Sequence, residues 1–128
     1  MRAWTLLCGL ALGMGCGGPE LTVELERDPG VQERIVWFRV FVREFTSETP
    51  VVYPAQRVGD GPIRIPFPEA GRAFTLRIDG CIEGDGCDVS RRVAVACSRT
   101  LVVEEGEAQT PIRLTLLPVP SPDPGGCP

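Results

Sequence analysis

The fold is decided by residues 35–45, which read IVWFRVFVREF. Every second residue from Val36 to Val42 is apolar, which is typical of a β-strand because successive side chains point to opposite faces of a sheet. The intervening positions are also largely apolar and carry two arginines; they are Ile35, Trp37, Arg39, Phe41, Arg43 and Phe45. A strand that is apolar on both faces usually has neighbours on both sides. The sequence therefore predicts a central β-strand here.

The second face of this strand has two interpretations. Aromatic rings that alternate with arginines could form a stripe that stacks on a sugar or another ligand, with a further ring from the next apolar segment. This candidate ligand face consists of Trp37, Arg39, Phe41, Arg43 and Tyr53. The other interpretation is a core strand whose second face is partly covered by a loop, and we favour this simpler one.

Shorter apolar or alternating segments lie on both sides of the central strand. They are residues 21–26, 51–53, 63–67, 72–80, 91–97, 101–103 and 112–116. Turn-forming Gly, Pro and Asp residues separate most of them. Prolines border the second and third of these segments, and they remove hydrogen-bond donors, so both are predicted to be edge strands. We expect an all-β domain over residues 21–117, a single antiparallel β-sandwich of about seven strands.

The run PEAGRAFTLRI at residues 68–78 resembles the carboxypeptidase-regulatory-like, transthyretin-like and Cna-B-like domains. In those families a segment with proline or leucine and then a glycine precede an aromatic-Thr-Leu strand. Residues 101–106 and 112–116 also resemble their last two strands. The resemblance implies an Ig-like or prealbumin-like β-sandwich. The internal isopeptide bond of Cna-B-like domains needs a lysine, which this chain lacks, and sandwich folds host many functions.

The start of the chain has the pattern of an export signal. Arg2 precedes an apolar run over residues 3–12, which is shorter than the roughly 20 residues that a membrane span needs. Gly13 and Gly15 form a small-x-small cleavage site. We therefore expect residues 1–15 to be a signal peptide.

Cys16 directly follows that cleavage site, and residues 12–16, LGMGC, resemble the lipobox of bacterial lipoproteins. Gly13 and Met14 depart from the Leu and Ala or Ser that the family usually has. The resemblance implies that Cys16 is lipidated, that residues 16–20 form a tether, and that Gly17, in place of Asp, directs the protein to the outer membrane. The alternative is a secreted or periplasmic protein with an unmodified cysteine.

Four further cysteines are candidates for structural disulfides, as expected in an exported chain. They are Cys81, Cys87, Cys97 and Cys127. A bond from Cys81 or Cys87 to Cys97 would join neighbouring strands, whereas one between Cys81 and Cys87 would close their loop. The remaining domain cysteine could then pair with Cys127 if the tail folds back. Residues 118–128 contain five prolines, which predicts a disordered or extended tail.

The loop between Cys81 and Cys87 is acidic and rich in glycine. Its neighbourhood could offer oxygen ligands to Ca²⁺ from Asp79, Glu83, Asp85 and Asp88. Their spacing matches no standard calcium loop, and Gly and Asp also form ordinary turns. A zinc site fits poorly, because the chain has no His and the cysteine spacings are wrong. We expect a solvated turn, with no metal and no cofactor.

The absence of His, Lys and Asn excludes several chemistries. Without His there is no Ser-His-Asp or Cys-His nucleophile, and without Lys there is no Schiff base. Paired carboxylates such as Asp79 and Glu83 could hydrolyse glycosides, but acids in a glycine-rich turn lack the burial that tunes such a pair. The formal charge of −4 opposes binding to nucleic-acid phosphates. We therefore expect neither an enzyme nor a nucleic-acid-binding protein.

Two functions remain open. The first is a lipid-anchored, non-catalytic β-sandwich of the cell envelope with a structural or protein-interaction role. Its expected partners are the membrane, through the lipid on Cys16, and an envelope protein. The alternative is a module that binds a carbohydrate or another envelope polymer through the candidate ligand face.

Overall fold

The computed structural model describes residues 20–45, 47–59, 61–66, 71–82, 87, 92–102, 111–123 and 126–127. Within these ranges nine strands make up one sheet, and no residue is helical. The strands are β1 (Glu20–Arg27), β2 (Trp37–Glu44), β3 (Val51–Val52), β4 (Gln56–Arg57), β5 (Ile63–Pro66), β6 (Ala73–Cys81), β7 (Arg92–Cys97), β8 (Leu101–Val102) and β9 (Ile112–Pro118). The predicted all-β class is confirmed. Accordingly, this described part of the chain has no helix that could span a lipid bilayer.

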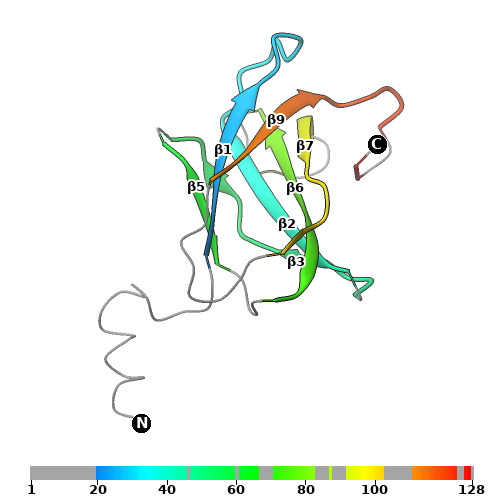
Figure 1. Cartoon of the computed structure of the whole chain (residues 1–128). Helices are drawn as coiled ribbons and strands as arrows, with labels where there is room; N and C mark the ends of the chain where they lie inside the picture. The colour runs from blue at the N-terminus through cyan, green and yellow to red at the C-terminus, as the bar shows by residue number, and fades with distance from the viewer. Residues whose placement is uncertain are drawn as a thin grey trace.

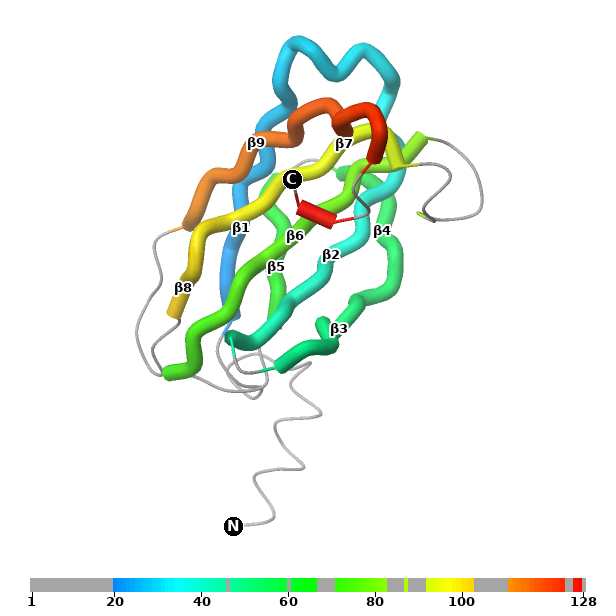
Figure 2. The backbone as a smooth tube through the Cα atoms, turned by 90° about the vertical axis from the view of Figure 1, so that its right-hand side faces the viewer, coloured from blue at the N-terminus to red at the C-terminus, as the bar shows by residue number. Residues whose placement is uncertain are grey.

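The strands follow the order β3-β2-β6-β7-β9-β1-β5, with β4 also paired to β2 and β8 to β6. The sheet curls, so that β1 and β5 face β2 and β6 across the interior (Figures 1 and 2). The described strand pairs are antiparallel except β1 and β9, which run parallel, with Val23 opposite Ile112 and Arg27 opposite Leu116. The sheet is therefore mixed, and the strictly antiparallel arrangement does not hold at this pair. Alternation predicts which residues face inward, but it does not specify which strands become neighbours.

The central-strand prediction for residues 35–45 is confirmed by β2, which has β6 on one side and β3 and β4 on the other. Phe38, Val40 and Val42 are buried on its inner face. The strand begins only at Trp37, so the alternation does not extend to Ile35, which packs against the core instead of lying on the outer face.

The core fills the space between the two arms of the curled sheet. One arm contributes Leu21, Val23, Ile65 and Leu116, and the other contributes Phe38, Val40, Val42, Phe74, Leu76, Ile78, Ala94 and Ala96. Each large aliphatic side chain that is fully buried stabilises the fold by about 1.5–3 kcal/mol. Val31 belongs to the same cluster, although its segment shows no alternation in the sequence.

The two proline-bordered segments lie at the edges of the sheet, as predicted. β3 ends the strand order on one side and β5 on the other. One element differs from the expected set, since no alternation in the sequence predicts β4. The predicted segment 101–103 contains β8, which pairs with β6 through Leu101 and Phe74.

The C-terminal segment folds back onto the sheet, so its described part is docked and not free. The Val119 N–H donates a hydrogen bond to the Val93 carbonyl at 3.2 Å, which extends the contact of β9 with β7. A disulfide then joins Cys97, at the end of β7, to Cys127. Figure 2 shows the segment returning past β7 toward β6. The prolines of this segment have no N–H to donate to the sheet. The segment is held instead by contacts of the Arg92 side chain and by the disulfide.

Candidate functional site

The outer face of β2 carries four residues of the candidate ligand face. Trp37, Arg39, Phe41 and Arg43 alternate with the buried Phe38, Val40 and Val42, and we call these four the outer β2 face. Their position follows directly from the two-residue period of the strand.

Guanidinium groups already cover both aromatic rings of the outer β2 face. The Arg57 guanidinium lies 4.7 Å from the centre of the Trp37 ring, and the Arg77 guanidinium lies 3.8 Å from the centre of the Phe41 ring. Both contacts are cross-strand pairs, since Trp37 is opposite Arg57 on β4 and Phe41 is opposite Arg77 on β6. A ligand that approaches this surface therefore meets guanidinium groups stacked on the rings, and not the exposed ring faces that the ligand-stripe interpretation requires.

Asp79 is the acidic residue opposite Arg39 on β6, but it forms its ion pairs with two other arginines. Arg77 donates to both of its carboxylate oxygens, at 3.1 and 3.0 Å. Arg92 lies 3.7 Å from it. The Arg39 Nε is buried and has no hydrogen-bond partner within the described ranges. The outer β2 face is thus positively charged, although the whole chain is negative.

Tyr53 lies apart from the outer β2 face. Its N–H donates to the Val40 carbonyl, and its side chain packs against the hydrophobic core on the inner side of the sheet. Its hydroxyl donates to the Pro66 carbonyl at the end of β5. Burial raises the pKa of this hydroxyl above its usual value. The structure therefore gives Tyr53 a structural role between two edge segments.

A buried ionic cluster joins β6, β7 and the C-terminal segment. The Arg92 side chain is only 1% exposed and lies between Asp79 and Asp123, at 3.7 and 3.6 Å. It also donates to the Gly126 carbonyl at 2.6 Å. Arg77 completes the cluster through Asp79. The sequence gives one signal for this cluster, because Arg92 begins an otherwise apolar strand. Its contacts with Asp79 and Asp123 could not be inferred, because these residues lie in other segments of the chain.

The disulfides settle the pairing that the sequence left open. Cys81 bonds to Cys87 across the loop after β6, and Cys97 bonds to Cys127. The expectation of structural disulfides is confirmed. The two alternatives that join Cys81 or Cys87 to Cys97 do not occur.

The acidic residues considered for calcium do not form a site that the structure describes. Asp79 is buried and held by two arginines. Glu83, Asp85 and Asp88 lie outside the described residues. Elsewhere in the described ranges, no group of three or more acidic or cysteine side chains could hold a metal ion.

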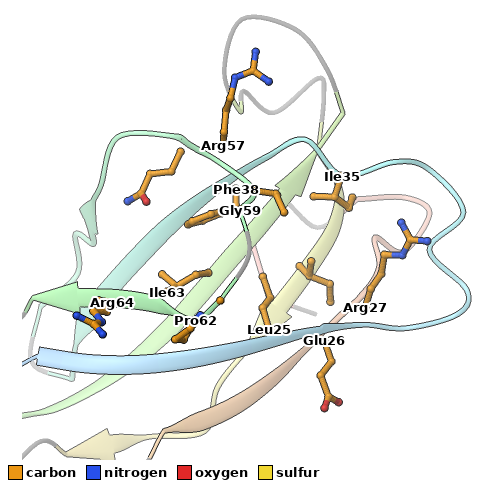
Figure 3. A pocket seen from close by; sticks show the side chains of 14 residues that line it. Leu25, Glu26, Arg27, Ile35, Phe38, Arg57, Gly59, Pro62, Ile63 and Arg64 are labelled. Carbon is orange, nitrogen blue, oxygen red and sulfur yellow. The ribbon is translucent and has the colours of Figure 1, made fainter.

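An apolar cleft lies where the curled sheet stays open, between β5 and β4. Its volume is about 570 Å³. It is lined by Leu25, Glu26, Arg27, Ile35, Phe38, Gln56, Arg57, Val58, Gly59, Gly61, Pro62, Ile63, Arg64 and Leu116, most of which Figure 3 labels. Sequence reasoning missed this cleft, because its walls come from segments that are far apart in the chain and that alternation alone does not bring together.

The proposed lipidation site, Cys16, lies outside the described residues. Comparison with known proteins adds no assignment: no family model matches this chain, and no curated protein matches it.

Proposed function

We propose that this protein is a lipid-anchored, non-catalytic module of the cell envelope, with a structural or protein-interaction role. The observation that carries the proposal is the pairing of cysteines. The two disulfides use Cys81, Cys87, Cys97 and Cys127, which are all the cysteines that follow Cys16. Only Cys8 remains, and it belongs to the proposed signal peptide. Cys16 is then left for lipid attachment, and disulfides themselves fit an oxidising, exported environment.

The domain is proposed to act as a β-sandwich held at the outer membrane by the tether at residues 16–20. Support for two opposed layers comes from the core, where Val23 and Ile65 of one arm pack in the same cluster as Val40 and Ile78 of the other. A rigid, disulfide-linked scaffold of this kind presents loops and strand faces to a partner protein. The buried, ion-paired Asp79 supports the non-catalytic assignment, because it is committed to two arginines.

Fractionation of cells that express the full chain tests the anchor. The wild-type protein is expected in the membrane fraction, and Cys16→Ser is expected to release it to the soluble fraction. Cys8→Ser is the matched control and is expected to stay with the membrane. If Cys16→Ser remains in the membrane fraction as fully as the wild type, lipid attachment at Cys16 is wrong.

A second candidate function is the binding of an acidic envelope polymer on the outer β2 face. The observation in its favour is the set of guanidinium groups there, with Arg57 stacked on Trp37, Arg77 stacked on Phe41 and Arg43 exposed. Because the rings are covered, acidic sugars are favoured over neutral ones as ligands.

The fluorescence of Trp37 offers a direct test of this second candidate. An acidic polysaccharide is expected to change it, and neutral dextran is not. The double variant Arg39→Gln with Arg43→Gln should abolish the change, whereas Arg99→Gln, an exposed arginine after β7, should not. An equal response to neutral dextran would contradict the charge-based account.

A further inference from the structure

The cleft between β5 and β4 has an apolar floor that stays partly open to solvent. Phe38 and Leu116 are buried at its base, whereas Leu25, Ile35 and Ile63 pack against the core yet remain only partly buried. Its volume, about 570 Å³, is in the range of small-molecule sites, which are typically some 300–1,000 Å³. The cleft can therefore bury an apolar group of small-molecule size.

Charged side chains border this cleft, and most of them are arginines, although the chain as a whole is negative. Three arginines line it, Arg27, Arg57 and Arg64, against one acid, Glu26. Figure 3 shows Glu26 extending away from the apolar side chains, on the other side of β1. Glu26 is also paired with Arg113, at 3.8 Å. Arg64 also lies on the outer side, because it is opposite Thr22 whereas Ile63 is opposite the buried Val23, and Arg57 is stacked on Trp37. Arg27 is therefore the cation on the apolar side of the cleft.

Arg27 is the cation best placed to meet a ligand. It follows Leu25 by two residues on β1, so both side chains belong to the same face of the strand. Its guanidinium donates to the Glu33 carbonyl at 3.2 Å, which orients it without neutralising it. Within the described part of the chain, no carboxylate forms an ion pair with Arg27.

The edge strand beside the cleft is poorly suited to a protein partner. A partner strand would have to pair with the free edge of β5, but β5 is four residues long and ends in Pro66, with Pro62 just before it. Proline supplies no N–H to a ladder, so strand addition is disfavoured there. An apolar chain that needs no backbone hydrogen bonds fits the cleft better.

We propose that this cleft binds a single-chain anionic amphiphile of the long-chain carboxylate class. The carboxylate accepts hydrogen bonds from Arg27, and the alkyl chain lies along Leu25, Ile63 and Phe38. This inference goes beyond the proposed envelope role and does not depend on the anchor at Cys16. Affinity should rise about fourfold for each methylene that becomes buried.

Calorimetric titration of the purified full chain with dodecanoate tests the site, with all probes kept below their micelle concentrations. Dodecanoate is expected to bind more tightly than decanoate and octanoate. Dodecyl phosphate should also bind, because it shares the anionic end, whereas dodecanol should bind at least tenfold more weakly. The absence of dodecanoate binding, or equal binding of dodecanol, would overturn the proposal.

Two matched pairs of variants locate the ligand. Arg27→Gln should weaken dodecanoate binding about tenfold or more, because a hydrogen bond to a charged group is lost. Arg99→Gln should leave it unchanged. Ile63→Ala should weaken binding several-fold, whereas Ile112→Ala should not, although both isoleucines flank Val23, on β5 and β9 respectively. Equal effects within either pair, in variants whose circular dichroism matches the wild type, would show that the ligand binds elsewhere.

Discussion

The guanidinium of Arg92 lies 3.6 Å from the carboxylate of Asp123, which ties the first residue of β7 to the C-terminal segment. The same guanidinium reaches Asp79 on β6 and the Gly126 carbonyl. The C-terminal segment is therefore a structural part of the domain, held by a buried cation as well as by a disulfide. This arrangement makes specific predictions about stability.

Arg92→Met should destabilise the fold by about 1.5–3 kcal/mol, because Asp79, Asp123 and the Gly126 carbonyl each lose a contact with a buried cation, while Asp79 keeps Arg77. Urea unfolding measures this change. Arg113→Met is the control, since the pairs of Arg113 with Glu24 and Glu26 are exposed and should contribute at most about 1 kcal/mol. Similar losses for the two variants would mean that the Arg92 cluster is not buried in solution.

Removal of the Cys97–Cys127 disulfide should cost more stability than removal of Cys81–Cys87. The first closes a loop with a sequence separation of 30 and the second one of 6. In the chain-entropy model these correspond to about 3–4 and about 2 kcal/mol. Thermal unfolding of the two double-alanine variants measures the difference. A Cys97→Ala, Cys127→Ala variant as stable as the wild type would contradict the docked C-terminal segment.

Tyr53 should make the fold sensitive to alkaline pH. Burial raises the pKa of its hydroxyl in the folded state, so its contribution is fully present below the unfolded pKa of about 10 and is lost as pH rises through the folded value. Ionisation also removes the proton that is donated to the Pro66 carbonyl.

Tyr53 is the one tyrosine in the chain, so phenolate absorbance reports its titration directly. Urea unfolding between pH 9 and 11 should show a loss of stability that Tyr53→Phe lacks. A midpoint of the absorbance titration at or below the value for free tyrosine would contradict the burial of this hydroxyl.

Gly80 should tolerate a larger side chain poorly. A Cβ at this position would lie 3.2 Å from Ile35 Cγ2 and 3.4 Å from Ala94 Cβ. Gly80→Val should therefore destabilise the fold by about 1–3 kcal/mol through overpacking. Gly59→Val, where an added Cβ meets nothing within 4 Å, should have a much smaller effect in the same urea experiment.

Much of the sheet could be predicted because local alternation determines which side chains face inward. The inner residues of β2, such as Val40, and the edge positions of β3 and β5 follow from alternation and from proline chemistry. The parallel pairing of β1 with β9 could not be predicted, since it joins the two ends of the domain. Long-range pairing depends on the packing of the whole core.

The candidate site was predictable only in part, for the same reason. Four of the five residues of the candidate ligand face lie on one strand, so the sequence alone predicts that they share one side of the sheet. Tyr53 belongs to a separate segment, and its inner position depends on the pairing of that segment with Val40. The stacking of Arg57 and Arg77 on the rings, and the cleft beside β5, depend on registers that alternation does not specify.

The central claim, an exported and lipid-anchored domain with two disulfides, is tested most directly by the intact mass of the native protein from the membrane fraction, with and without reductant. The account predicts a chain that begins at Cys16 and carries a diacyl or triacyl group. Its mass should rise by four hydrogens on reduction, two for each disulfide. A mass without lipid, or one that retains residues 1–15, would contradict the account.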